Sequence, residues 1–150
     1  MSESFLVVFN SQGSNVIDNS SKNAVQYNVN WGAFLPKKYK KFHCQFIFKS
    51  QNYQGNLTDN GFVSMNIGHV NVFDGLQMTN NIGIVYPVNL TNNSSFYNST
   101  NNDNNDFWID YPIQTAITIT LNKFGGGVMA NMQHYCLYLS LQGIPDENII

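Results

Sequence analysis

Arginine is absent from this chain, and charged residues of any kind are scarce. Asp, Glu, Lys and Arg make up 11% of the 150 residues, against a usual share of about 25%. Lysine supplies all 7 basic residues, and the formal net charge is -2. No run of about 18 apolar residues occurs, so the sequence predicts no membrane span. Without a basic excess to contact phosphates, no specific nucleic-acid binding is expected.

Amides and aromatic rings take the place of charge. The chain contains 24 Asn, and aromatic residues make up 14% of it. That aromatic share is too high for a fully disordered chain, and a chain of this length buries enough surface for one core. Frequent Asn, Ile, Phe, Tyr and Lys, together with the missing arginine, indicate a gene rich in A and T. We therefore expect a single domain over residues 1–150.

The first residues do not look like a targeting sequence. A signal peptide needs a basic start and an apolar run of about 7–15 residues. Here the acidic Glu3 precedes the short apolar run Phe5–Phe9, which we interpret as the first strand. No signal peptide is expected, and the Asn-x-Ser/Thr sequons are expected to be unglycosylated. Cys44 and Cys136 fit free thiols in a reducing compartment, although the sequence leaves a disulfide between them open.

A period-two alternation of β-branched and aromatic residues predicts strands along the whole chain. It is clearest over 41–49, 113–121 and 135–141, where one face of each predicted strand is apolar. Burial on one face is typical of antiparallel sheets. No segment has a convincing helical period, although Trp31–Leu35 is compatible with a short helical turn. The predicted strands are Phe5–Phe9, Ala24–Asn30, Lys41–Lys49, Phe62–Val72, Ile82–Tyr86, Phe107–Asp110, Ile113–Leu121 and Tyr135–Leu141.

About eight strands without helices between them predict an all-β fold, an antiparallel two-sheet sandwich. We favour a single jelly roll over an immunoglobulin-like sandwich, although the pattern does not reveal the strand order. The segment 89–106 is rich in Asn, Ser and Thr, so it is expected to form an exposed loop. We interpret this loop mainly as a tolerated insertion. Alternatively, it is a tip that touches a neighbour through Phe96 and Tyr97.

Signatures of catalysis and metal binding are missing. His134 and Cys136 fall on one face of the last predicted strand, but His43 and Cys44 fall on opposite faces of theirs. Three or four converging zinc ligands are therefore not available. Gly125–Gly127 lacks the following Lys-Ser/Thr of a phosphate-binding loop, and no motif surrounds any Cys–His combination. We expect no enzymatic activity, no cofactor and no bound metal.

Four of the 7 lysines cluster directly before or at the start of the most hydrophobic predicted strand. One interpretation is a positive patch for an acidic partner surface or a nucleic acid. The preferred one is that they suppress edge-to-edge aggregation of that strand. The missing arginine argues further against base recognition. The lysines of this candidate basic patch are Lys37, Lys38, Lys40 and Lys41.

Two aromatic clusters lie beside prolines. Trp31 lies shortly before Pro36 and is expected to plug one end of the core. Trp108 and Tyr111 precede Pro112 and either close the other end or anchor an interface, because Trp and Tyr dominate interface hot spots. The candidate interface residues are Trp31, Phe34, Phe96, Tyr97, Trp108 and Tyr111.

Three stretches, Tyr27–Trp31, Phe34–Pro36 and Phe42–Phe48, resemble the small capsid proteins of large eukaryotic double-stranded DNA viruses and virophages. The strand number, the loop character and the codon bias are similar over most of the chain. Those proteins are single jelly rolls that build pentons or cement the major capsid lattice. The resemblance implies a homo-oligomer that contacts other capsid proteins in a virion assembled in the host cytoplasm. It carries over no individual functional residue.

The leading expectation is therefore a structural virion protein, a penton or minor capsid subunit that acts through protein–protein assembly. Low net charge limits repulsion between packed copies, and neutral amides can pair across interfaces without desolvating a charge. The alternative is a receptor- or carbohydrate-binding sandwich, in which an aromatic platform is combined with amide and carboxylate groups. Its candidate patch consists of Asn105, Trp108, Asp110 and Tyr111.

Overall fold

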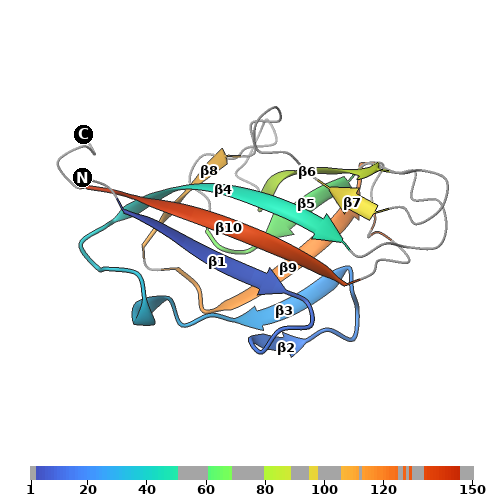
Figure 1. The fold of residues 1–150 in the computed structure, drawn as a ribbon, viewed down its shortest axis with the longest axis horizontal. Coiled ribbons are helices and arrows are strands. Elements are labelled where there is room, and N and C mark those ends of the chain that lie inside the picture. The colour runs from blue at the N-terminus through green and yellow to red at the C-terminus, as the bar shows by residue number, and fades with distance from the viewer. Residues whose placement is uncertain are drawn as a thin grey trace.

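The computed structural model shows an all-β chain whose strands lie in two layers (Figure 1). The structure describes residues 3–50, 61–68, 80–88, 95–97, 106–111, 113–124, 127, 129 and 134–145. Within these ranges the one helical element is η1, a single turn of 3-10 helix at Trp31–Ala33. The described residues contain no helix that is both long enough and apolar enough to cross a membrane.

The first layer, sheet A, is antiparallel and runs in the order β1-β10-β4-β8. The second layer, sheet B, is also antiparallel and runs β2-β3-β9-β5-β6. The strands of sheet A are β1 (Ser4–Asn10), β10 (Tyr135–Ile144), β4 (Lys41–Ser50) and β8 (Asp106–Asp110). Those of sheet B are β2 (Val16–Asp18), β3 (Ala24–Asn28), β9 (Ala116–Lys123), β5 (Gly61–Met65) and β6 (Asn81–Val88).

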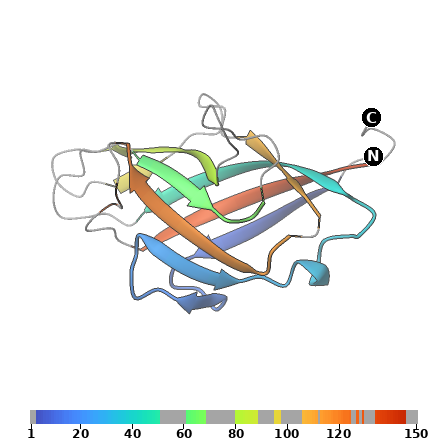
Figure 2. The same cartoon turned by 180° about the vertical axis from the view of Figure 1, so that it is seen from behind.

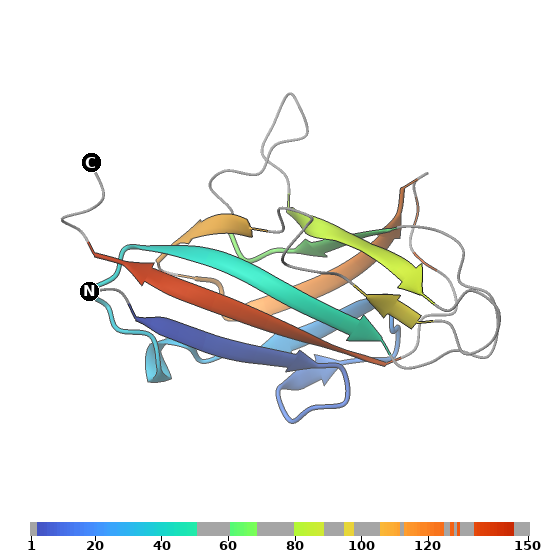
Figure 3. The ribbon, with the colours of Figure 1, turned by 45° about the horizontal axis from the view of Figure 1, so that its top comes forward.

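A short strand, β7 (Ser95–Tyr97), links the two layers along one side of the molecule. It pairs with β4 of sheet A and with β6 of sheet B. Figure 2 shows the sandwich from the side of sheet B, and Figure 3 shows β7 beside the end of β6. The opposite side of the sandwich, formed by β1 and β2, has no such link among the described strands.

The strand order confirms the predicted sandwich and defines its topology. Without the two three-residue strands, sheet A is β1-β10-β4-β8 and sheet B is β3-β9-β5-β6. Strands that follow one another in sequence therefore alternate between the sheets, apart from the β5–β6 hairpin. Two four-stranded antiparallel sheets connected in this way form a jelly roll, the eight-stranded double Greek key.

The core lies between the sheets and is built from the apolar faces that the sequence predicts. On β4, the side chains of Phe42, Cys44, Phe46 and Phe48 are almost fully buried, with at most 1% exposed. A one-residue shift in register would turn this whole face to solvent, so the burial of one face specifies the register. The same alternation buries Ile117, Ile119 and Leu121 of β9, and Tyr135, Leu137, Leu139 and Leu141 of β10.

A hydrogen bond between two tyrosines joins the two sheets across the core. The Tyr27 hydroxyl of β3 donates a hydrogen bond to the Tyr135 hydroxyl of β10 at 2.9 Å. Both rings are buried, with 0% and 2% exposed. Burial raises the pKa of Tyr27 to about 12 and raises that of Tyr135 well above its ordinary value, because the phenolate would be poorly solvated there. The pair therefore ties sheet A to sheet B while both hydroxyls stay protonated.

The structure departs from the predicted strands in several places. The predicted strand Ile113–Leu121 begins only at Ala116, as β9, and the predicted strand Ala24–Asn30 ends at Asn28, as β3. The predicted strand Phe62–Val72 ends at Met65, and its last residues lie outside the described ones. Val16–Asp18 forms β2, which the alternation does not reveal because the strand has only three residues. Within the predicted loop 89–106, residues 95–97 form β7 and Asp106 begins β8, while the other residues lie outside the described part.

Candidate functional site

The outer face of sheet A presents the most coherent apolar surface in the described structure. Val8, Tyr138 and Ile47 are direct cross-strand neighbours on β1, β10 and β4. Their exposed fractions are 40%, 43% and 50%, and that of Leu6, two residues before Val8, is 61%. Together the four expose on the order of 300 Å², a size at which patches on monomers are often functional. We call these four residues the outer row.

The outer row follows from sequences that are apolar on both faces of a strand. Ile47 lies between the buried Phe46 and Phe48, and Tyr138 lies between the buried Leu137 and Leu139. Since successive side chains of a strand point to opposite faces, the interleaved residues must face outward. The period-two pattern predicted over 41–49 and 135–141 puts Ile47 and Tyr138 on the faces opposite the apolar ones, but sequence analysis did not identify them as a site. One feature of the sequence could have identified this site. Ile47 and Tyr138 are apolar at positions where a sheet face exposed to solvent normally carries polar residues.

The same face is polar and ion-paired toward β8. The His43 ring packs against the Trp108 ring at an interplanar angle of 39°, with ring centroids 4.8 Å apart. The His43 ring nitrogen Nε2 lies 3.1 Å from the Asp106 carboxylate. One edge of the outer row is therefore bordered by an aromatic pair whose imidazole is held by a carboxylate, and Trp108 is partly exposed there.

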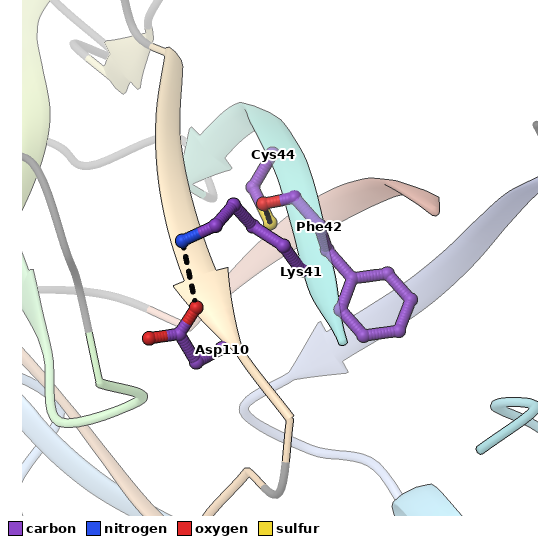
Figure 4. A network of polar contacts seen from close by, with 4 residues as sticks. All are labelled: Lys41, Phe42, Cys44 and Asp110. Atoms are coloured by element: carbon purple, nitrogen blue, oxygen red, sulfur yellow. Dashed lines mark hydrogen bonds and ion pairs between the residues drawn. The ribbon is translucent and has the colours of Figure 1, made fainter. Parts of the chain in front are cut away.

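A second ion pair lies further along β4 and β8. The Lys41 ammonium contacts the Asp110 carboxylate at 2.9 Å, and both residues are also cross-strand neighbours. Figure 4 shows this pair on one side of β4, with the Phe42 ring pointing away from it. Because Asp110 already neutralises Lys41, neither charge is free to bind a ligand without first breaking this contact.

The four lysines of the predicted basic patch do not act together. Lys38 forms an ion pair with Glu3 at 3.2 Å, and Lys41 pairs with Asp110. Lys40 donates to the backbone carbonyl of Lys37 at 3.2 Å. With two of the four charges matched by carboxylates, the cluster is not a continuous positive surface.

Tyr39, which lies among these lysines, belongs to the core. Its ring is 1% exposed, and its hydroxyl donates to the Glu3 carboxylate at 2.8 Å. This hydrogen bond and the Lys38 ammonium hold the pKa of Glu3 below its ordinary value. The backbone of Gly143 lies directly against the Tyr39 ring, where an added Cβ would come within 2.7 Å of it. The lysine cluster is thus anchored by a buried tyrosine.

The interpretation of the lysines as guards of an edge strand does not fit the topology. β4 lies inside sheet A, with β10 on one side and β8 and β7 on the other. The outer strands of sheet A are β1 and β8. No lysine lies in either of these two strands. The lysines therefore precede a strand that has no open edge to protect.

The predicted interface aromatics fall into different surroundings. Trp31 is 2% exposed, and its indole nitrogen donates to the Gln114 carbonyl at 2.7 Å. Its predicted burial is confirmed, and that burial leaves it almost no surface for a partner. Phe34 packs against Trp31 with ring centroids 5.8 Å apart and keeps 40% of its surface exposed. Tyr111 is half-buried against the core, near Phe42.

Phe96 and Tyr97 lie on β7 rather than in an irregular loop tip. Tyr97 is the cross-strand neighbour of both Lys49 on β4 and Tyr86 on β6. Their side chains lie outside the part of the structure that is described. Their predicted contact with a neighbour therefore stays a prediction.

The two cysteines are free and lie on opposite faces of sheet A. Cys44 faces the core, where burial raises the pKa of its thiol. Cys136 is partly exposed on the outer face. In the register of β4 and β10, Cys44 lies opposite Leu141 and Cys136 lies opposite Lys49. The disulfide that the sequence left open is therefore excluded by position.

His134 and Cys136 border a depression of about 280 Å³ at one end of sheet A, together with Lys49. The His134 ring nitrogen Nδ1 lies 2.9 Å from the Ser11 hydroxyl, which also accepts the Tyr135 amide hydrogen at 2.9 Å. Partial burial, and to a lesser extent Lys22, lowers the pKa of His134. Ser11 is 0% exposed, so its hydroxyl is not accessible to attack a substrate.

The described residues contain no group of three or more His, Cys, Asp and Glu side chains that could hold a metal ion. What the described residues provide is an apolar row, flanked by polar and ion-paired residues, on the outer face of sheet A. Such a surface provides shape and hydrophobic contact rather than reactive groups.

The chain matches none of the protein-family models or curated proteins with which it was compared.

Proposed function

We propose that this protein is a structural jelly-roll subunit of a virion, a penton or minor capsid protein that acts through protein–protein assembly. The observation that carries the proposal is the outer row, Leu6, Val8, Ile47 and Tyr138, exposed across three strands of sheet A. The jelly roll recurs in viral capsids, lectins and cupins, so the topology is compatible with the proposal without selecting it. The resemblance of the sequence to small capsid proteins is the reason for preferring a capsid role within this group.

The residues on the outer face of sheet A favour a role in which another protein surface covers this face. An apolar patch of about 300 Å² that is rimmed by polar residues often marks a protein–protein interaction site. Around the outer row lie neutral polar residues of the same strands, among them Ser140 and Gln45. An apolar centre with a polar rim is the usual arrangement of a protein–protein interface. On this proposal the protein acts in the capsid, next to copies of itself and other capsid proteins.

The mass of the protein in solution tests the proposal. We expect light scattering after size exclusion to show a discrete oligomer whose population rises with concentration. The double variant Ile47→Ser/Tyr138→Ser removes the centre of the outer row, so its mass should fall. The matched control is Gln45→Ser, a polar change on the same exposed face of β4, which should leave the mass unchanged. A wild-type monomer at every concentration would contradict assembly through this face.

Carbohydrate binding, the alternative function, has less support from the geometry of its candidate patch. The Trp108 ring is in contact with the His43 ring, and the Asp110 carboxylate is bound to Lys41. Asn105 lies outside the described residues. We expect no saturable binding on a glycan array. Saturable binding that disappears in Trp108→Ala would favour the carbohydrate-binding module instead.

A further inference from the structure

The open edge of β1 carries backbone groups that no described strand satisfies. Glu3 accepts a backbone hydrogen bond from Gly143, and Ser11 donates one to Tyr135. These two bonds show that the backbone N–H and C=O groups of the odd-numbered residues of β1 point toward β10. Because hydrogen-bonding direction alternates along an antiparallel strand, the N–H and C=O groups of Ser4, Leu6 and Val8 face away from β10.

This edge lacks the features that usually protect an edge strand. Lysines, prolines, bulges and inward-pointing charges blunt most exposed edges. β1 reads Ser-Phe-Leu-Val-Val-Phe-Asn, pairs with β10 in an unbroken register, and contains none of these features. Its inward side chains, Val7 and Phe9, are buried, and its outward ones, Leu6 and Val8, are exposed and apolar. An edge of this kind is expected to be paired in the working protein.

We propose that the occupant of this edge is the β1 strand of a second copy, paired antiparallel about a two-fold axis near Val7. In that arrangement Leu6 of each copy lies opposite Val8 of its partner, and each such pair exchanges two backbone hydrogen bonds. The two copies of sheet A then form one continuous sheet. This inference rests on the proposed assembly function. It specifies one contact through which two subunits would assemble.

Charge and symmetry favour a second copy over a foreign strand. No charged residue occurs between Glu3 and Asp18, so two identical β1 strands meet without the like-charge repulsion that destabilises cross-strand neighbours. The same lack of charge leaves nothing on the edge to select a charged foreign peptide. An antiparallel strand pair is self-complementary, which is what a two-fold contact between identical subunits requires. The outer rows of the two copies also become continuous, because Leu6 and Val8 belong both to the outer row and to the paired β1 edge.

Proline at Val8 separates edge pairing from contacts of the outer face. The Val8 N–H points to the open edge, so Val8→Pro removes a bond to the partner but none to β10. The matched control, Val8→Ala, loses the same outward side chain and keeps the N–H. Both are made in the Ile47→Ser/Tyr138→Ser background, which removes the centre of the outer row and so disrupts contacts made through that face. Cooperative urea unfolding of each variant verifies that it is folded.

We expect the background variant to be a dimer, Val8→Ala to remain one, and Val8→Pro to halve the mass. A background variant that is already monomeric, or a Val8→Pro variant that stays dimeric, would overturn edge pairing. In either case the loss of larger assemblies in Ile47→Ser/Tyr138→Ser would leave the proposed function standing. A wild-type protein that never self-associates would contradict both proposals.

Amide exchange of the unmodified protein gives a second readout that no substitution can disturb. If β1 pairs with its copy, the amides of Leu6 and Val8 exchange more slowly as the protein concentration rises. The amide of Val7 bonds to β10 in either state, so it serves as the internal reference. Exchange at Leu6 and Val8 that is fast and independent of concentration would rule out the pairing.

Discussion

Replacing Phe46 by alanine should lower the free energy of unfolding by about 3–5 kcal/mol, the usual cost of truncating a buried aromatic ring. Phe46 is 1% exposed and lies on β4, an interior strand of sheet A, directly opposite the buried Leu139. Its neighbours belong to both sheets, so the cavity cannot close by moving one strand alone. Urea unfolding followed by circular dichroism measures the change.

The matched control is Ile47→Ala on the same strand. Ile47 is 50% exposed on the opposite face, so its truncation should change the stability of the monomer by about 0.5 kcal/mol or less, as is usual for surface positions. Unfolding at low protein concentration keeps assembly from contributing. A larger loss in Ile47→Ala than in Phe46→Ala would mean that the register of β4 differs from the one described, because a one-residue shift exchanges the two faces.

Raising the pH from 9 to 12 should destabilise the protein through its buried tyrosine pair. In the unfolded chain Tyr27 ionises near its ordinary pKa of 10, whereas in the folded protein it holds its proton to about 12. Above pH 10 the unfolded state therefore binds fewer protons than the folded one, and stability falls as pH rises. The contribution of Tyr27 is complete below pH 10 and is lost between pH 10 and 12. It amounts to about 2–3 kcal/mol.

The double variant Tyr27→Phe/Tyr135→Phe isolates this effect from other groups that titrate at high pH. Removing both hydroxyls leaves no unpaired partner, so the fold is retained. Urea unfolding at a series of pH values should show a shallower alkaline loss of stability in the variant than in the wild type. Identical pH profiles would show that the two hydroxyls are not buried together.

The fold class could be predicted because the apolar pattern records burial directly. The alternations on β4, β9 and β10 identify the buried faces correctly, since a strand with one buried face tolerates no shift in register. The short strands β2 and β7 were not predicted, because a pattern can be recognised only over a longer run of residues. β2 and β7 each contain three residues, too few for a period to emerge, and they form because neighbouring strands supply partners.

The candidate site could not be assembled from sequence, because it depends on which strands pair. Val8 and Tyr138 are 130 positions apart and become neighbours only through the β1–β10 register. The lysines were interpreted as protecting an edge, a role that depends on strand order. Ser11 and His134 are likewise separated by 123 positions in the sequence. Local patterns reveal the faces of strands, but the partners come from tertiary contacts of long sequence separation.

The position of β10 has a consequence for synthesis. β10 is the last of the described strands, yet it lies between β1 and β4, which are among the first. A ribosome must therefore translate through Ile144 before sheet A can close. Until then, the edges of β1 and β4 that later pair with β10 stay unpaired, and they are exposed to other nascent chains. Contacts between such distant segments make folding slow, on a scale of milliseconds to seconds. The period in which a nascent chain is most vulnerable to aggregation thus ends only when β10 inserts.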